Sequence, residues 1–219
     1  MRNQTVATLM AGAILLASSC AKSEPAPAAT SAAPAATAAP ARPAPAAPGT
    51  VTGKVPGFAP GAFAIVVLEP KTPREFPALT ETPVMDQVGQ TFSPAVLFVR
   101  TGQPVEFRNS DDTLHNVHVT NEDTREGAFN VAIPTENTYS YIFEQDGFYH
   151  VGCDIHPAMS AEIISTTTPF ATMASADGSY EFDDVPPGSY RLTIYSGGAK
   201  TQSDVDVTAS PPRGTPSPE

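Results

Sequence analysis

The chain has 219 residues and a formal net charge of -11, with 24 prolines, two cysteines and no tryptophan. Ala- and Pro-rich stretches at both ends leave roughly 160 residues for folding, which is room for one or two small β modules and too little for a large enzyme. The acidic charge repels phosphate backbones, so we expect no nucleic acid partner.

Residues 1–19 are typical of a secretion signal. One basic residue precedes an apolar stretch from Val6 to Ala17, which is too short to span a bilayer, and small residues then lead into Cys20. This order resembles the bacterial lipoprotein signal, although that family usually has Leu where Ala17 stands. The resemblance implies a periplasm-facing protein anchored to a membrane by lipid on Cys20. The alternative is ordinary cleavage, with Cys20 left as a free or paired thiol.

The residue after the lipidation site bears on the choice of membrane. Ala21 is not the Asp that resembles an inner-membrane retention signal, so the outer membrane is favoured where the cell has one. After it, Ala and Pro dominate the segment 20–49. Proline at this density blocks helix formation, and few bulky apolar groups are present to build a core, so we predict a disordered, partly extended linker. The tail 210–219 has a similar composition.

Between these ends the sequence predicts an all-β fold. Short runs of β-branched and aromatic residues alternate with clusters of Gly, Pro, Asn and Asp. The runs Ala95–Arg100 and Pro104–Asn109 flank the turn "TGQP" and predict a hairpin. Alternation places Val105 and Phe107 on one face of its second strand.

In the next predicted strand, alternation places the two histidines, His115 and His118, on opposite faces. In "LHNVHVT", alternation groups His115 with Val117 and Val119, and it places Asn116 and His118 on the opposite face. We therefore expect His115 to point inward with the hydrophobic set. His118 is interpreted as a surface residue.

A second strand brings the cysteine inward. In "FYHVGC", Val151 and Cys153 share a face, while His150 points outward and is interpreted as a surface residue. The following loop adds His156 and Met159, each three residues after the previous sulfur or nitrogen donor. An inward histidine and an inward cysteine at the ends of two strands could thus meet at one end of a sandwich.

Two imidazoles, a thiolate and a weak thioether are the ligand set of a blue-copper site. Zinc fits less well, because it rarely uses thioether, whereas soft sulfur favours Cu(I) and imidazole suits both copper oxidation states. Taken singly, Cys153, Met159 and His115 could each be core residues. A further alternative is a nucleophilic Cys153 activated by His115 or His156, but the loop offers no obvious oxyanion donor.

The paired motifs "HNVHV" and "CDIHPAM" resemble the cupredoxins, and among them the amicyanin-like blue copper proteins. The resemblance covers residues 80–166 and implies a Greek-key β-sandwich with one type 1 copper. Residue by residue, it implies that the metal ligands are His115, Cys153, His156 and, in the axial position, Met159.

The same resemblance implies supporting roles around the metal. Asn109 matches an asparagine that ties the ligand loops together by hydrogen bonds, and the Asn116 amide matches a donor to the cysteine sulfur. Asp154 departs from the pattern, because many cupredoxins have Ser or Thr there. The resemblance therefore predicts neither the hydrogen bonding of this loop nor the reduction potential of the copper. Pro157 has no N–H to offer the thiolate.

A second resemblance covers residues 50–79 and 167–209. The segments "GTVTGKVPG", "FAIVVLEP" and "ADGSYEFDDVPPGSY" look like the two halves of a carboxypeptidase-regulatory-like, transthyretin-like sandwich. Tyr180 and Phe182 share one face of a predicted strand. Neither half could bury its apolar face alone, so we expect the cupredoxin domain to be inserted within this small sandwich. The competing interpretation is one larger sandwich with extra strands.

These observations favour electron transfer by a membrane-anchored, periplasm-facing type 1 copper protein and imply no catalytic residues. The acidic surface suits a basic redox partner such as a cytochrome c. One alternative is a copper carrier or chaperone, and a second is a non-redox scaffold or adhesion lipoprotein. Delivery proteins more often have exposed Met- and His-rich runs, and none occur in this sequence.

Overall fold

The computed structural model describes residues 47–59 and 62–209. The predicted signal peptide 1–19, the predicted lipidation site Cys20, most of the predicted linker and the tail 210–219 lie outside the described residues. Within the described ranges the regular elements are strands, β1 to β15, which confirms the all-β fold class. No helix in this part of the chain is long and apolar enough to cross a membrane.

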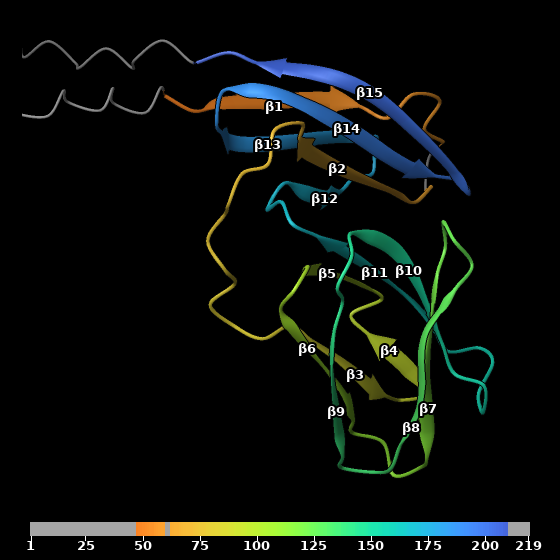
Figure 1. Cartoon of the computed structure of the whole chain (residues 1–219). Coiled ribbons are helices and arrows are strands. Elements are labelled where there is room, and N and C mark those ends of the chain that lie inside the picture. Colours follow the sequence, from red (N-terminus) through yellow and green to blue (C-terminus); the bar gives the residue numbers. More distant parts are fainter. Residues whose placement is uncertain (1–46, 60–61, 210–219) are drawn as a thin grey trace, which may run out of the picture. The chain divides into compact units, whose positions relative to one another are not determined.

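Strands β3 to β11 form a sandwich of two sheets (Figure 1). One sheet has the order β4-β3-β6-β9 and comprises β3 (Val84–Val88), β4 (Thr91–Ser93), β6 (Pro104–Asn109) and β9 (Thr138–Ile142). The other has the order β5-β11-β10-β7-β8 and comprises β5 (Val96–Arg100), β7 (His115–Asn121), β8 (Gly127–Ile133), β10 (Gly147–Gly152) and β11 (Ser160–Thr166). The pairs β3–β6 and β5–β11 are parallel, so connections cross between the sheets, as a Greek-key sandwich requires.

The predicted hairpin between β5 and β6 is wrong, because these strands belong to different sheets. Strand β5 pairs with β11, and β6 pairs with β3 and β9. The turn between them crosses the sandwich edge, with the Thr101 N–H donating to the Thr166 carbonyl and the Gly102 N–H to the Phe143 carbonyl. Alternation predicts which face of a strand is buried, but it does not predict which strand lies beside it. The predicted buried face of β6 is therefore confirmed, whereas the predicted pairing of β5 with β6 is not.

The interior of this sandwich contains the side chains that strand alternation predicted to be buried. Val105, Phe107, Val117, Val119 and Val151 are fully buried in one apolar cluster. Packing of this kind leaves little freedom for the strand ends that carry the polar site residues.

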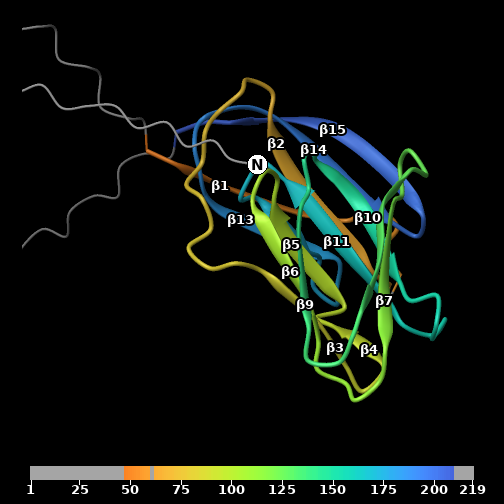
Figure 2. The same cartoon turned by 60° about the horizontal axis from the view of Figure 1, so that its bottom comes forward.

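The remaining strands form a second, smaller sandwich (Figure 2). Strand β1 (Gly49–Lys54) pairs with β13 (Ser179–Val185), and a four-stranded sheet has the order β12-β2-β14-β15, with β2 (Ala64–Pro70), β12 (Ala171–Met173), β14 (Gly188–Ser196) and β15 (Ala199–Val207). Each sheet therefore combines strands from before and after the β3–β11 segment. The exact domain boundaries stay a prediction.

A small apolar cluster joins the two sandwiches. Ile65 and Val67 of β2 pack with Ile164 of β11, and the rings of Phe148 and Tyr195 lie 5.1 Å apart. Strand β5 contributes its outward side chains to the same cluster. This explains why β5 is apolar on both faces: one face lies in the β3–β11 core and the other against β2.

Candidate metal centre

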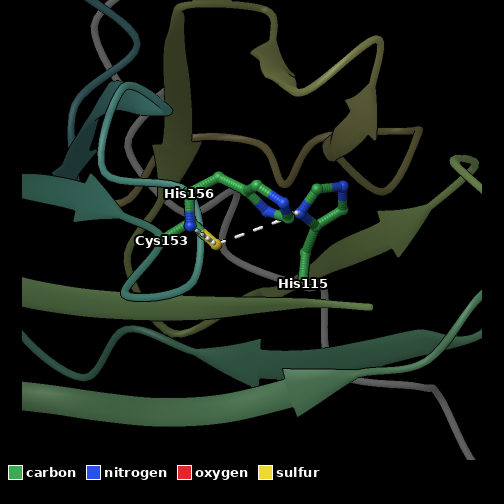
Figure 3. A group of neighbouring side chains, drawn as sticks. All are labelled: His115, Cys153 and His156. Atoms are coloured by element: carbon green, nitrogen blue, oxygen red, sulfur yellow. Dashed lines mark hydrogen bonds between the residues drawn. The ribbon is translucent and has the colours of Figure 1, made fainter. Parts of the chain in front are cut away.

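Three predicted ligands meet at one end of the β3–β11 sandwich (Figure 3). The Nδ1 atoms of His115 and His156 lie 2.9 Å apart, and Cys153 Sγ lies 3.9 Å from His115 Nδ1. One donor atom from each residue lies within 4.8 Å of the other two. Among the described residues, this is the group of three or more His, Cys, Asp or Glu side chains arranged to hold a metal ion.

Strand register explains why His115 and Cys153 meet. Strands β7 and β10 are antiparallel neighbours in which Gly152 lies opposite His118. Cys153 follows Gly152 directly and therefore points to the opposite, inner face, which His115 also faces from the start of β7. Cys153 is 4% exposed and His115 is 0% exposed, which confirms that both side chains point inward.

The loop after β10 brings the next two candidates. The backbone N–H of His156 donates to Cys153 Sγ at 3.4 Å, and the N–H of Met159 donates to the His156 carbonyl at 2.9 Å. Met159 is 1% exposed and belongs to the same apolar cluster as Cys153. Its role as axial ligand stays a prediction, as do the ligand roles of the other three.

Asn109 ties the ligand loops together as predicted. Its Nδ2 donates to the carbonyls of Thr113 and Ile133, both at 2.8 Å, and its Oδ1 accepts from the Asp111 N–H. The first of these bonds holds the loop that runs directly into His115. The side chain is fully buried, so these bonds are shielded from water.

Asp111 is a site residue that sequence reasoning missed. Its Oδ2 lies 2.8 Å from His115 Nε2, and its carboxylate also accepts the N–H groups of Gln90 and Gly89. These bonds, with that of Gln90 foremost, hold the pKa of the Asp111 carboxyl below its usual value, although burial opposes the shift. A carboxylate on Nε2 fixes the imidazole ring with Nδ1 toward the metal position. An acidic residue four positions before a candidate ligand could have signalled this role.

The Asn116 amide is oriented opposite to the predicted direction. Its Oδ1, and not its nitrogen, faces Cys153 Sγ at 3.3 Å, so the expected donation from this amide to the sulfur is wrong. The reason is that Oδ1 also accepts the backbone N–H groups of Asp154, at 2.8 Å, and Ile155, at 3.4 Å. Asn116 nonetheless lies beside the sulfur, as expected. The backbone donor at the sulfur is the N–H of His156.

Asp154, the departure from the cupredoxin pattern, lies in a polar network on the outer face. Its Oδ1 lies 3.0 Å from His118 Nδ1, and its Oδ2 accepts from the Nδ2 atoms of Asn116 and Asn130. The contact with His118, followed by that with Asn130, lowers the pKa of the Asp154 carboxyl. The side chains of His118 and His150 are 42% and 41% exposed, which confirms both as surface residues.

The donor set fits one copper ion. Two imidazole nitrogens and one thiol sulfur converge where two of the three residues are buried, and the two rings present their Nδ1 atoms to each other. This combination of soft sulfur and borderline nitrogen is the one that copper prefers. The His156 N–H donates to the Cys153 sulfur itself, so this backbone donor is engaged by the sulfur in the described part of the chain.

Comparison with known families agrees with this geometry. Residues 81–165 match the model of the copper binding proteins of the plastocyanin/azurin family, so this part of the chain is similar to a cupredoxin-type copper-binding domain. Residues 126–213 match the model of polysaccharide lyase family 4, domain II, which the second β domain resembles. The two matches overlap in the strands from β8 to β11. No curated protein matches the sequence.

Several solved structures are similar to this chain. A purple cupredoxin from Nitrosopumilus maritimus is 20% identical, with 38% of this chain and 98% of that one covered and a TM-score of 0.35. A Cu(I) form of an amicyanin mutant is 20% identical, with coverages of 46% and 97% and a TM-score of 0.36. A copper-containing nitrite reductase from Thermus scotoductus is 26% identical, with coverages of 44% and 25% and a TM-score of 0.36.

Proposed function

We propose that this chain is a type 1 (blue) copper protein that carries single electrons, held on the periplasm-facing side of a membrane by lipid on Cys20. The observation that carries the proposal is the convergence of His115, Cys153 and His156 within a domain that matches the plastocyanin/azurin family. When bound, copper supplies a one-electron couple, Cu(I) to Cu(II). The proposed role is that of a carrier and not of an enzyme.

The protein holds its donor atoms in nearly fixed positions, which suits rapid electron exchange. His115 is fully buried and is clamped by Asp111, while Asn109 holds the loop before it. Cys153 leaves a strand that is paired on both sides, with β7 and with β11. A site that cannot rearrange costs little reorganisation energy when its charge changes, because no ligand has to move.

His156 is the candidate exit for the electron. It is the one partly exposed member of the three, and exposed apolar side chains lie next to the ligands in sequence at Leu114 and Ile155. A partner that packs on these side chains would approach the His156 ring closely. Weak apolar contacts of this kind suit a brief encounter, which a carrier needs in order to turn over.

The charge of the surface supports a basic partner such as a cytochrome c. The whole chain carries a formal charge of -11, and the carboxylates of Asp112, Glu136 and Asp154 are exposed. Asp112 and Asp154 lie within three residues of His115 and Cys153, and the Glu136 N–H donates to the carbonyl of Asn109. Complementary charge speeds diffusional encounter more than it strengthens the final complex. Membrane attachment rests on the leader and Cys20, and the outer membrane is proposed where the cell has one.

An absorption spectrum of the soluble part with Cu(II) tests the copper site. We expect an intense visible band from the Cys153 thiolate to copper, and Cys153→Ser should abolish it while the fold is retained. A matched control is Ser160→Ala, which changes an exposed hydroxyl at the start of β11 and should leave the band intact. The proposal would be contradicted if the wild-type protein bound Cu(II) without colour and the Cys153→Ser variant bound Cu(II) equally well.

Electron exchange separates the proposed carrier from its alternatives. In a stopped-flow assay, the Cu(I) protein should donate an electron to oxidised basic cytochrome c, or the Cu(II) protein accept one from the reduced cytochrome, faster than free copper does. A chaperone would instead pass Cu(I) to a copper-free acceptor without such exchange. A scaffold or adhesion protein would do neither, and copper would change only its stability.

A further inference from the structure

We propose that Asp154 is a positioning residue that sets the orientation of the Asn116 amide and, through it, the hydrogen bonding of the Cys153 sulfur. The inference rests on the proposed role of Cys153 as a copper ligand. Its consequence is a reduction potential held lower than a neutral residue at this position would allow.

The Asp154 carboxylate is shared by three donors on two neighbouring strands. His118 Nδ1 lies 3.0 Å from Oδ1, while Asn116 Nδ2 and Asn130 Nδ2 donate to Oδ2 at 2.9 and 2.8 Å. His118 and Asn116 are on β7, and Asn130 is on β8. The carboxylate therefore attaches the loop after Cys153 to both strands. A side chain with one acceptor oxygen could not replace it, because three donors converge on two oxygens.

These contacts determine which end of the Asn116 amide faces the sulfur. Asn116 Nδ2 is engaged by both Asp154 Oδ2 and Asn130 Oδ1, the latter at 2.8 Å. Oδ1 must then point toward the loop, where it accepts the Asp154 N–H and lies 3.3 Å from Cys153 Sγ. The side chain is only 6% exposed, so a turned amide would leave buried donors facing one another.

The orientation affects the electron density of the sulfur. An amide oxygen cannot donate to a thiolate, so in this arrangement the His156 N–H is the backbone donor at Cys153 Sγ. A thiolate that receives fewer hydrogen bonds keeps more charge for the metal, and the nearby carboxylate adds its own negative field. Both effects stabilise Cu(II) relative to Cu(I) and lower the reduction potential.

Replacing the carboxylate by its neutral isostere tests the effect on the copper site. Asp154→Asn should raise the reduction potential of the copper-loaded protein and move the visible thiolate-to-copper band in energy. The control is Asp112→Asn, which removes the same charge from an exposed residue close to His115 in sequence. Its potential should shift upward less, and its band should stay in place. Equal shifts in potential with an unmoved band in both variants would show a charge effect alone and overturn the positioning role.

The copper-free protein gives a second readout that does not depend on the metal. In NMR spectra of the 15N-labelled protein, the Asn116 side-chain NH2 signals should move and exchange faster with solvent in Asp154→Asn, and they should be unchanged in Asp112→Asn. Asn116 signals that stay the same in Asp154→Asn would overturn the proposal. A wild-type protein without a blue band, together with the expected NMR change, would instead refute the copper function and leave the positioning role standing.

Discussion

His115 and His118 are three positions apart on β7, yet their side chains lie in different surroundings. His115 is fully buried with Nδ1 beside His156, while His118 points to the outer face and contacts Asp154. A one-residue slip of the strand would exchange the faces of these side chains. The fold therefore places His115 with the other candidate ligands and leaves His118 in a polar network on the surface.

This selection can be tested by a pair of alanine variants. His115→Ala should abolish the blue colour and lower copper affinity by orders of magnitude, because one of the two proposed imidazole donors would be lost. His118→Ala should keep the colour and nearly the same affinity. Both are measured by copper titration with absorption detection. Reversed effects would mean that the register of β7 differs by an odd number of residues.

The thioether of Met159 has a different predicted role. Because a thioether is a weak axial ligand, Met159→Leu should retain copper and colour while the reduction potential rises, since the loss of its donation disfavours Cu(II) more than Cu(I). The two side chains are similar in volume, so the fold should be kept. Voltammetry of the wild-type and variant proteins gives the comparison. An unchanged potential would leave Met159 as a core residue.

Hydrogen bonds and ion pairs between neighbouring residues hold the ends of some strands, in addition to the packing of the core. In the second sandwich, Asp177 precedes β13 and accepts hydrogen bonds from the backbone N–H and hydroxyl of Ser179, while Lys54 of β1 lies 2.9 Å away. These contacts, with the Ser179 hydroxyl foremost, place the pKa of the Asp177 carboxyl well below its usual value. The turn before β13 and the end of β1 are thereby linked.

The lowered pKa predicts how stability depends on pH. The folded protein holds the ionised carboxylate more strongly than the unfolded chain does, so the contribution is present above the unfolded pKa and is lost as pH falls through the folded value. In the metal-free protein, Asp177→Asn should lower the melting temperature by at most a few degrees at neutral pH, because the group is exposed, and the difference should shrink in strong acid. Glu181→Gln, an exposed change on the same strand, is the control. A difference that does not vary with pH would contradict the assignment.

The chain as a whole is acidic, and the candidate metal centre is partly exposed at His156. A formal charge of -11 acts over about 10 Å at moderate ionic strength, so under the proposed function it would guide the approach of a basic partner without adding much to the final contact. The second sandwich packs on the β5 and β11 side of the cupredoxin-type domain through a small apolar cluster. The ligand loops lie at the ends of β7 and β10 and contribute no residue to that cluster.

Salt dependence tests this arrangement. The rate of electron exchange with a basic cytochrome c should fall several-fold as ionic strength rises from about 10 mM to about 200 mM, because the attraction is screened. Neutralising Asp112 and Glu136 together, by Asp112→Asn and Glu136→Gln, should reduce this dependence. The same change in charge at Asp206 and Glu181, on the second sandwich, should affect it less. A rate that is insensitive to salt in the wild-type protein would argue against a basic partner.

Local sequence patterns were sufficient to predict the strand class, the buried faces of the strands and three residues that gather at the candidate metal centre. Alternation depends only on the two-residue period of a strand, so Val105, Phe107, His115 and Cys153 could be placed inward without knowing their neighbours. The spacing of Cys153, His156 and Met159 is local, and a short loop can bring such residues together whatever the rest of the chain does.

Features that depend on partners distant in sequence could not be predicted from local patterns. Strands β5 and β6 separate into different sheets because each pairs with strands elsewhere in the chain, which a local turn pattern does not reveal. The clamp of Asp111 on His115 requires the Gly89 and Gln90 backbone from another loop, and the orientation of the Asn116 amide depends on Asn130 and Asp154. Hydrogen-bond direction is set by the whole set of donors and acceptors around a group, and that set exists only in the folded chain.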